Sequence, residues 1–136
     1  MNTLSIFPDM LTFGLLAPFI LRVVIGLIFI YFGVSKIWLE KERRVKFFKK
    51  IGFGAGIVFF WIISVLEIIG GVFLMLGLFT QPTSLVLMLI IIGAIYTKIR
   101  HPHLLDNTVE FYFLVLAVLL SLLVLGPGFW GIDLPL

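Results

Sequence analysis

The sequence predicts an all-α integral membrane protein, a four-helix bundle with both termini on the outer side of the membrane. Of its 136 residues, 62% are hydrophobic and only 12% are charged, whereas a soluble domain has roughly 45–50% apolar and about 25% charged residues. Four apolar stretches each approach the roughly 20 residues that cross a bilayer as a helix. Because lipid offers the backbone no hydrogen bonds, these stretches are expected to be helices, which pair their N–H and C=O groups internally.

The four expected spans cover residues 15–38, 54–79, 82–99 and 109–125. The first span is not expected to be a cleaved signal peptide. It is too long for one, no Lys or Arg precedes it, and Arg22 lies in its interior.

Short connections fix the directions of the later spans. Thr80, Gln81 and Pro82 form the expected turn between the second and third spans, and Pro suits the first turn of a helix. These two spans are therefore predicted to form an antiparallel hairpin. Before the fourth span, Asn107 is the expected N-cap, and Glu110 then falls at the third helical position, where a carboxylate favours the positive helix end.

The distribution of Lys and Arg predicts the orientation. Basic residues are concentrated in loop 39–53, and loop 100–108 begins with another, whereas residues 1–14 and 126–136 contain none. Short loops rich in Lys and Arg stay in the cytoplasm. The chain is therefore expected to be a multi-pass protein of the plasma membrane with both basic loops in the cytoplasm. The mixture of basic and apolar residues in the first loop is also typical of a helix lying on an anionic leaflet.

Two ionisable residues, Arg22 and Glu67, lie within the expected spans, and Lys36 lies nearer the inner boundary. Such residues are costly in lipid, usually face the bundle interior and mark function by default. Arg22 and Glu67 fall at similar depths, so an ion pair between them is the expected contact, with Asp133 in the outer tail as a rival partner for Arg22. A buried pair can also serve only to fix the helix register, and both roles stay open.

Glycines recur along the same helical faces as these charged residues. Steps of three and four residues place them on one stripe of the first span and one stripe of the second. Glycines at such positions let helix backbones approach closely in membranes, so the two stripes are expected to face each other or to line one shared interior. The glycines assigned to helix packing are Gly26, Gly33, Gly70, Gly71 and Gly77.

A second polar group lies at the inner boundary. His101, His103, Asp106 and Glu110 are residue types that several divalent metals accept, but their spacing matches no metal-binding motif, so no metal site is predicted. The absence of cysteine excludes thiolate catalysis within this chain. Aromatic residues near this boundary are interpreted as an interfacial belt. They are Trp38, Tyr96, Phe111 and Tyr112.

The order and spacing of these residues resemble the DoxX family of small four-helix membrane proteins. The similarity covers nearly the whole chain as one DoxX-like transmembrane domain, residues 1–136. It joins the stripes of the first and second spans to a Gly-Pro-Gly segment after the fourth. The matching residues are Leu21, Arg22, Gly26, Phe29, Gly33, Lys36, Glu67, Gly70, Gly71, Leu74, Leu76, Gly77, Leu78, Thr80, Gly126, Pro127, Gly128 and Asp133.

The resemblance implies a compact bundle in the plasma membrane. Some family members look like subunits of a thiosulfate:quinone oxidoreductase, and others are linked with catechol or quinone handling. Lacking cysteine, this chain is expected to be the quinone-facing or anchoring subunit of an oxidoreductase, with sulfur chemistry elsewhere. A quinone site needs an apolar slot with a few polar groups. Arg22, Tyr31 and Glu67 are therefore the candidate quinone-binding residues, and Arg22 and Glu67 are the candidate catalytic residues that anchor a quinone oxygen and handle a proton.

Two other functions stay open. The bundle could be a non-enzymatic anchor or assembly factor that recruits a soluble enzyme through loop 39–53. It could also be a small transporter, which would need an oligomer, because four helices are few and no inverted repeat is visible. The expected partners are the lipid bilayer and an oxidoreductase subunit, with a homo-oligomer left open. Nucleic acid is not expected, because the basic residues lie almost entirely in one loop beside apolar spans.

Overall fold

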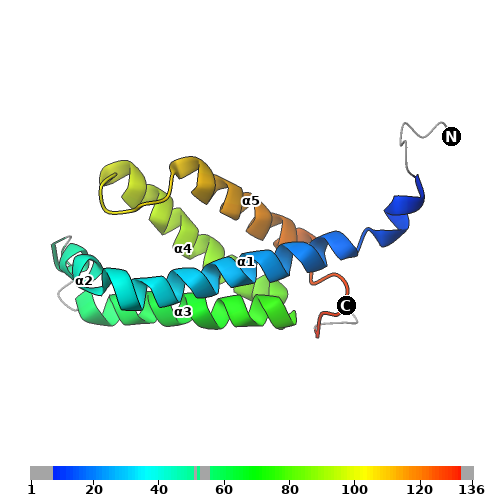
Figure 1. The fold of residues 1–136 in the computed structure, drawn as a ribbon, viewed down its shortest axis with the longest axis horizontal. Coiled ribbons are helices and arrows are strands. Elements are labelled where there is room, and N and C mark those ends of the chain that lie inside the picture. Colours follow the sequence, from blue (N-terminus) through cyan, green and yellow to red (C-terminus); the bar gives the residue numbers. More distant parts are fainter. Residues whose placement is uncertain (1–7, 51, 53–55, 133–136) are drawn as a thin grey trace.

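The computed structural model describes residues 8–50, 52 and 56–132. These residues form an elongated helical bundle, and none of them lies in a strand (Figure 1). In chain order the elements are a short 3-10 helix η1 (Pro8–Phe13), α1 (Leu16–Ser35), a π-helical turn η2 (Lys36–Glu40), α2 (Lys41–Lys50), α3 (Gly56–Leu76), α4 (Thr80–Arg100) and α5 (Val109–Leu125).

The helices confirm the predicted all-α, multi-pass membrane fold. Three are long and apolar enough to cross a membrane, namely Leu16–Lys50, Ile57–Leu76 and Thr80–Arg100. The fourth, α5, has 17 residues, which is at the lower end of the range of roughly 17–25 residues that span a bilayer. The last three expected spans lie within a few residues of α3, α4 and α5, whereas the first helical segment extends beyond its expected end at residue 38.

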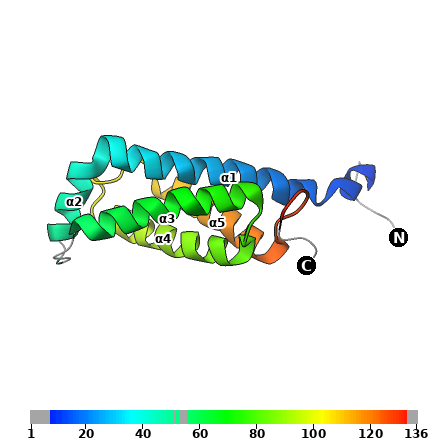
Figure 2. The same cartoon turned by 90° about the horizontal axis from the view of Figure 1, so that it is seen from below.

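The sequence predicted a loop over residues 39–53, but the first span does not end in a loop. The helix instead continues through the π turn as far as Lys50. π turns commonly bend a helix, and Figure 2 shows α2 turned away from the axis of α1 across the end of the bundle. There α2 meets the start of α3, where the rings of Phe48 and Phe59 lie 6.2 Å apart. The basic segment is thus a helix that covers one end of the bundle.

α1 and α3 make the most extensive contact between any two helices. An added Cβ on Gly26 would lie 2.6 Å from the carbonyl oxygen of Gly71, and one on Gly71 would lie equally close to that of Gly26. One on Gly33 would lie 2.8 Å from the carbonyl oxygen of Ser64. Only glycine permits such an approach of two helix backbones. These contacts fix the register of α1 against α3.

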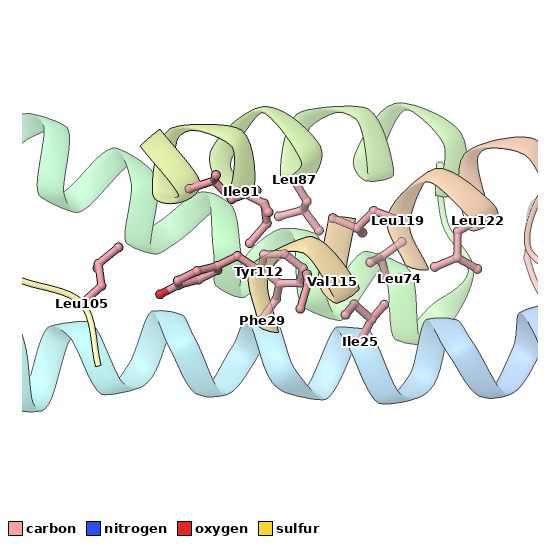
Figure 3. Close-up of a cluster of buried hydrophobic side chains, with 11 residues drawn as sticks. Ile25, Phe29, Leu74, Leu87, Ile91, Leu105, Tyr112, Val115, Leu119 and Leu122 are labelled. Carbon is pink, nitrogen blue, oxygen red and sulfur yellow. The ribbon is translucent and has the colours of Figure 1, made fainter. Parts of the chain in front are cut away.

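α4 and α5 form the second closely packed pair, and the hydrophobic core lies between the two pairs (Figure 3). Each long helix contributes to it, for instance Phe29, Leu74, Leu87 and Leu119, which are 0% exposed. α3 and α4 touch less extensively than the helices within each pair. Across that seam Gly70 faces the side chain of Leu87 rather than a backbone. The bundle is therefore held more loosely between α3 and α4.

The connection between α3 and α4 lies earlier in the chain than the predicted turn at Thr80, Gln81 and Pro82, which are already helical. It consists of residues 77–79, because α4 already begins at Thr80. Gly77 has φ +69° and Phe79 has φ +46°, both in the left-handed region. Pro82 lies in the first turn of α4, where its missing N–H costs no helical hydrogen bond.

The N-cap of α5 is also displaced from the predicted position. Thr108 Oγ1 accepts a hydrogen bond of 3.2 Å from the backbone N–H of Phe111. The expected cap at Asn107 is therefore wrong by one residue. This leaves the side chain of Asn107 free to face the interior of the bundle, where it lines a cavity.

The basic segments of the sequence meet at one end of the bundle, called the basic end below, which consists of α2 and residues 101–108. The two parts touch through Arg43 and Asp106, whose Nη2 and Oδ2 atoms lie 3.6 Å apart. The first and last described segments meet at the opposite end, where the N–H of Phe129 donates to the carbonyl oxygen of Leu15 at 3.1 Å. The fold thus places α2, which holds six of the ten Lys and Arg residues, at the end of the bundle opposite the segments of Leu15 and Phe129 (Figure 1).

Candidate functional site

Lys36 and Glu67 form an ion pair inside the bundle. Lys36 Nζ donates to Glu67 Oε1 at 2.6 Å. The Glu67 side chain is only 2% exposed and that of Lys36 is 16% exposed. The second carboxylate oxygen, Oε2, is buried and has no hydrogen-bond partner among the described residues. Buried polar atoms are normally satisfied, so this oxygen marks a place where a polar group from elsewhere would be stabilised.

The direction of helical side chains explains why Glu67 meets Lys36 and not Arg22. Side chains tilt toward the N-terminus of their own helix, and α1 and α3 run antiparallel (Figure 1). Glu67 and Arg22 therefore tilt toward opposite ends of the bundle, whereas Lys36, near the basic end, tilts back toward Glu67. The expected Arg22–Glu67 ion pair is wrong.

Arg22 joins three segments at the opposite end of the bundle. Its Nη1 donates to the carbonyl oxygens of Met75 at 2.6 Å and Leu74 at 3.3 Å, and its Nη2 donates to that of Phe129 at 2.7 Å. The residue is 1% exposed. Asp133, the rival partner considered from the sequence, lies outside the described residues. Arg22 thus satisfies backbone carbonyls at the C-terminus of α3, well away from Lys36 and Glu67.

A cavity of about 140 Å³ lies beside the Lys36–Glu67 pair. Residues from α1, the π turn, α2, α3, α4, the 101–108 segment and α5 contribute to its wall. Figure 3 shows the hydroxyl of Tyr112 pointing out of the core toward Leu105, and both residues line this cavity. Besides the ion pair, the polar groups on the wall include Ser35, Glu40, Arg44, Asn107 and Tyr112.

Charged residues of α2 and the π turn hold the basic end together over the cavity. Arg44 donates to Glu40 Oε2 through Nε at 2.9 Å and through Nη2 at 2.7 Å. Arg43 Nη2 lies 3.1 Å from Glu40 Oε1 and also approaches Asp106. Both N–H groups of Arg44 thus donate to one oxygen of Glu40, while Arg43 approaches the other. The contacts to Glu40 join the π turn to α2, and the contact of Arg43 with Asp106 joins α2 to the 101–108 segment.

The three candidate quinone-binding residues named from the sequence do not come together. Glu67 lies at the centre of the site, and Tyr31 lines the cavity while 66% of the residue stays exposed. Arg22 does not line it. Tyr112, expected from the sequence to lie in an interfacial belt, is only 5% exposed and belongs to the core and the cavity wall. The observed partner of Glu67 is Lys36. Its position on the same helical stripe as the glycines of the first span was the signal in the sequence that pointed to it.

His101, His103, Asp106 and Glu110 form no metal-binding cluster. Among the residues that the structure describes, no group of three or more His, Asp or Glu is placed to hold a metal ion. His101 instead packs against the ring of Phe47 of α2, with ring centroids 5.3 Å apart.

The cavity combines the Lys36–Glu67 ion pair and several other polar groups with apolar side chains. A Lys ammonium has three donors, one of which goes to Glu67 Oε1. Glu67 Oε2 offers an acceptor, and Phe32, Ile91 and Leu105 contribute apolar surface. Concave sites that join apolar surface to convergent polar groups are typical of small-molecule binding. The fold and the site therefore define a small multi-pass membrane protein with a polar cavity at one end of its bundle.

Comparison with known proteins identifies its family. The DoxX family model matches residues 17–99, and the chain belongs to that family. It is 34% identical over 115 residues to the Bacillus subtilis protein named "Putative oxidoreductase CatD", an alignment that covers 84% of this chain and 82% of that protein. It is 30% identical over 125 residues to "Uncharacterized membrane protein Rv3486" of Mycobacterium tuberculosis, covering 83% of this chain and 77% of that one. No solved structure matches.

Proposed function

We propose that the chain is the quinone-facing membrane subunit of an oxidoreductase and that the cavity beside Lys36 and Glu67 receives the quinone head group. The observation that carries this proposal is the buried Oε2 of Glu67, which has no hydrogen-bond partner among the described residues, next to a partly buried ammonium in a cavity whose wall is both polar and apolar. A quinone presents two carbonyl oxygens on an apolar ring, and a quinol presents two hydroxyls. One strong donor and one strong acceptor suit both forms.

Within this proposal each residue has a distinct role. Lys36 donates a hydrogen bond to a quinone oxygen, and Glu67 accepts one from a quinol hydroxyl and is the group that holds or passes a proton. A bound quinone would supply two-electron, two-proton redox chemistry, which no side chain of this chain supplies by itself. Arg22 takes no part in binding, because it is committed to backbone carbonyls at the other end of the bundle.

The absence of cysteine limits what the chain does alone. Oxidation of a sulfur substrate through a thiol would have to occur on another subunit. The relative from Bacillus subtilis carries the word oxidoreductase in its name, which supports a redox context. The partner would reach the site from the basic end, which we propose to be the cytoplasmic side of the plasma membrane because of its Lys and Arg content.

Direct binding tests the proposal. The protein would be placed in lipid nanodiscs and titrated with a tail-less, methyl-substituted quinone, with empty nanodiscs to correct for partition into lipid. The double variant Lys36→Met with Glu67→Leu should lower the affinity by about tenfold or more, a loss equivalent to one good hydrogen bond. The control is the double variant Glu42→Leu with Lys46→Met, which changes the same two charge types on exposed positions of α2. Absence of saturable binding by the wild type, or equal binding by both variants, would overturn the proposal.

A non-enzymatic anchoring role is the second candidate, and one observation favours it. A basic groove at the basic end joins Arg43, Lys46 and Lys50 of α2 to Arg100, His101 and His103. Among the residues that the structure describes, no Asp or Glu lines it. An acidic surface of a soluble enzyme would fit such a groove. Native mass spectrometry of protein extracted from its own membranes would separate the candidates, since a retained quinone favours the first and a quinone-free complex with a soluble protein favours the second.

A further inference from the structure

We infer that the ligand of the Lys36–Glu67 cavity carries an apolar tail and reaches the cavity from within the bilayer, through a groove beside α4 that opens at Gly93. This inference rests on the proposed function, because it specifies which quinones the same site takes. It concerns the lipid-facing side of the bundle rather than the charged groups of the cavity.

The groove adjoins the polar cavity. It has a volume of about 500 Å³ and is lined by the π turn, α2, α3, α4 and the 101–108 segment. Four residues line both spaces, namely Lys36, Arg44, Ala94 and Leu105. Lys36 and Arg44 are also the only charged residues on the groove wall in the described part of the chain. The groove is therefore apolar along its length and charged only where it meets the cavity.

The open side of the groove faces lipid. Leu89 and Tyr96 on its rim are 64% and 63% exposed, and Gly93 between them is exposed as well. All three belong to α4, which is long and apolar enough to span the membrane. A molecule that enters here comes from the hydrocarbon region, whereas α2 and the 101–108 segment cover the cavity at the basic end.

Gly93 keeps this passage open. A Cβ at Gly93 would have no heavy atom within 4 Å, in contrast to Gly26 and Gly71, whose added Cβ atoms would meet a backbone oxygen. Helix packing therefore does not require glycine at position 93. Gly93 faces space rather than a neighbour, and a larger side chain there would narrow the groove without disturbing a contact.

The groove explains how a lipid-soluble ligand can place a polar head beside an ion pair. The tail of such a ligand is already in an apolar phase, so moving it into the groove yields little hydrophobic gain, because lipid chains are as apolar as leucine. The groove instead lets the head reach Lys36 while the tail stays out of water. A tail-less ligand has no such requirement, so the two kinds of ligand should respond differently when the groove is filled.

The experiment compares two quinones on two variants in nanodiscs. One quinone is tail-less and the other carries a ten-carbon alkyl tail on the same ring. Gly93→Trp should weaken binding of the tailed quinone by about tenfold or more and leave the affinity for the tail-less one within about twofold of the wild-type value. Gly93→Leu introduces a smaller side chain and should likewise weaken binding of the tailed quinone more than binding of the tail-less one. The matched control is Ile92→Trp on the same helix, where the residue is 49% exposed and does not line the groove, and it should change neither affinity.

The outcomes separate the inference from the proposed function. If Gly93→Trp leaves binding of the tailed quinone unchanged, the tail does not lie in this groove and the inference is overturned while the proposed function stands. If it weakens both quinones equally, the substitution blocks the head-group cavity itself, and the inference is likewise overturned. If the wild type binds neither quinone, the proposed function fails first.

Discussion

Arg22 binds the carbonyl oxygen of Phe129 through Nη2 at 2.7 Å, although 107 residues separate them along the chain. The same guanidinium binds the carbonyls of Leu74 and Met75, which belong to the last turn of α3. The last carbonyls of a helix have no partner within it, and a positive charge near them is favourable. Arg22 therefore caps α3 and ties the segment after α5 to the first pair of helices.

Replacing Arg22 should weaken the fold and spare the cavity. Arg22→Met leaves the carbonyl oxygens of Met75 and Phe129 without the guanidinium donor, which costs about 1–3 kcal/mol for each group left unsatisfied. A lower melting temperature in nanodiscs, together with unchanged affinity for a tail-less quinone, is the expected result. Arg43→Met, which alters a partly exposed arginine, is the control for loss of charge. Loss of quinone binding at unchanged stability would instead indicate that Arg22 is a binding residue.

Removing only one member of the Lys36–Glu67 ion pair should lower the stability of the fold. Lys36→Met leaves the Glu67 carboxylate buried and uncompensated, and breaking a buried pair in this way costs about 3–5 kcal/mol. The double variant Lys36→Met with Glu67→Leu removes both charges and should recover most of that loss, because an apolar replacement of a buried pair is often neutral. Thermal unfolding of the single and double variants measures the difference. If the double variant is as unstable as the single one, the pair does more for the fold than compensate charge.

The glycine contact between α1 and α3 should tolerate no side chain. Gly26→Val would place its side chain against the carbonyl oxygen of Gly71, and forcing extra atoms into a packed contact typically costs about 1–3 kcal/mol. Gly93→Val is the matched control, since it adds the same atoms on another helix where no neighbour lies within 4 Å. A melting temperature that falls only for the first variant is expected. Equal effects would mean that helix propensity, rather than the contact, is responsible.

The orientation can be tested directly because the chain has no cysteine of its own. Single variants Met10→Cys and Lys49→Cys place one thiol at each end of the bundle, both on exposed residues. In intact cells a membrane-impermeant maleimide should label the first and not the second, because Lys- and Arg-rich segments stay in the cytoplasm. Both should react after the membrane is permeabilised. The reverse pattern would contradict the proposed orientation.

The spans could be predicted from the sequence because length and apolar composition alone decide whether a helix crosses a membrane. Depth along a span was not enough to predict the ion pair. Arg22 and Glu67 are both near the middle of apolar stretches, but their side chains tilt in opposite directions once α1 and α3 are antiparallel. The tilt displaces the end of each side chain along the bundle by about one helical turn, or roughly 5 Å. This displacement is longer than a hydrogen bond, so the two charged groups do not meet.

The site itself depended on features that no linear pattern contains. The π turn at Lys36–Glu40 turns α2 across the bundle, and composition does not predict where a helix changes its hydrogen-bonding period. Tyr112 has the same aromatic and interfacial character as Trp38, yet one is 5% and the other 80% exposed. Only the pairing of α5 against the other helices decides between them.

The bend at the π turn also makes the surrounding lipid a determinant of the site. Six of the ten Lys and Arg residues of the chain lie in α2, which crosses the end of the bundle and contributes Arg44 to the cavity wall. Anionic headgroups attract each nearby Lys or Arg by about 1 kcal/mol. The charge density of the leaflet therefore attracts α2, which covers the cavity. The position of α2 over the cavity would differ between membranes that are rich and poor in acidic lipid.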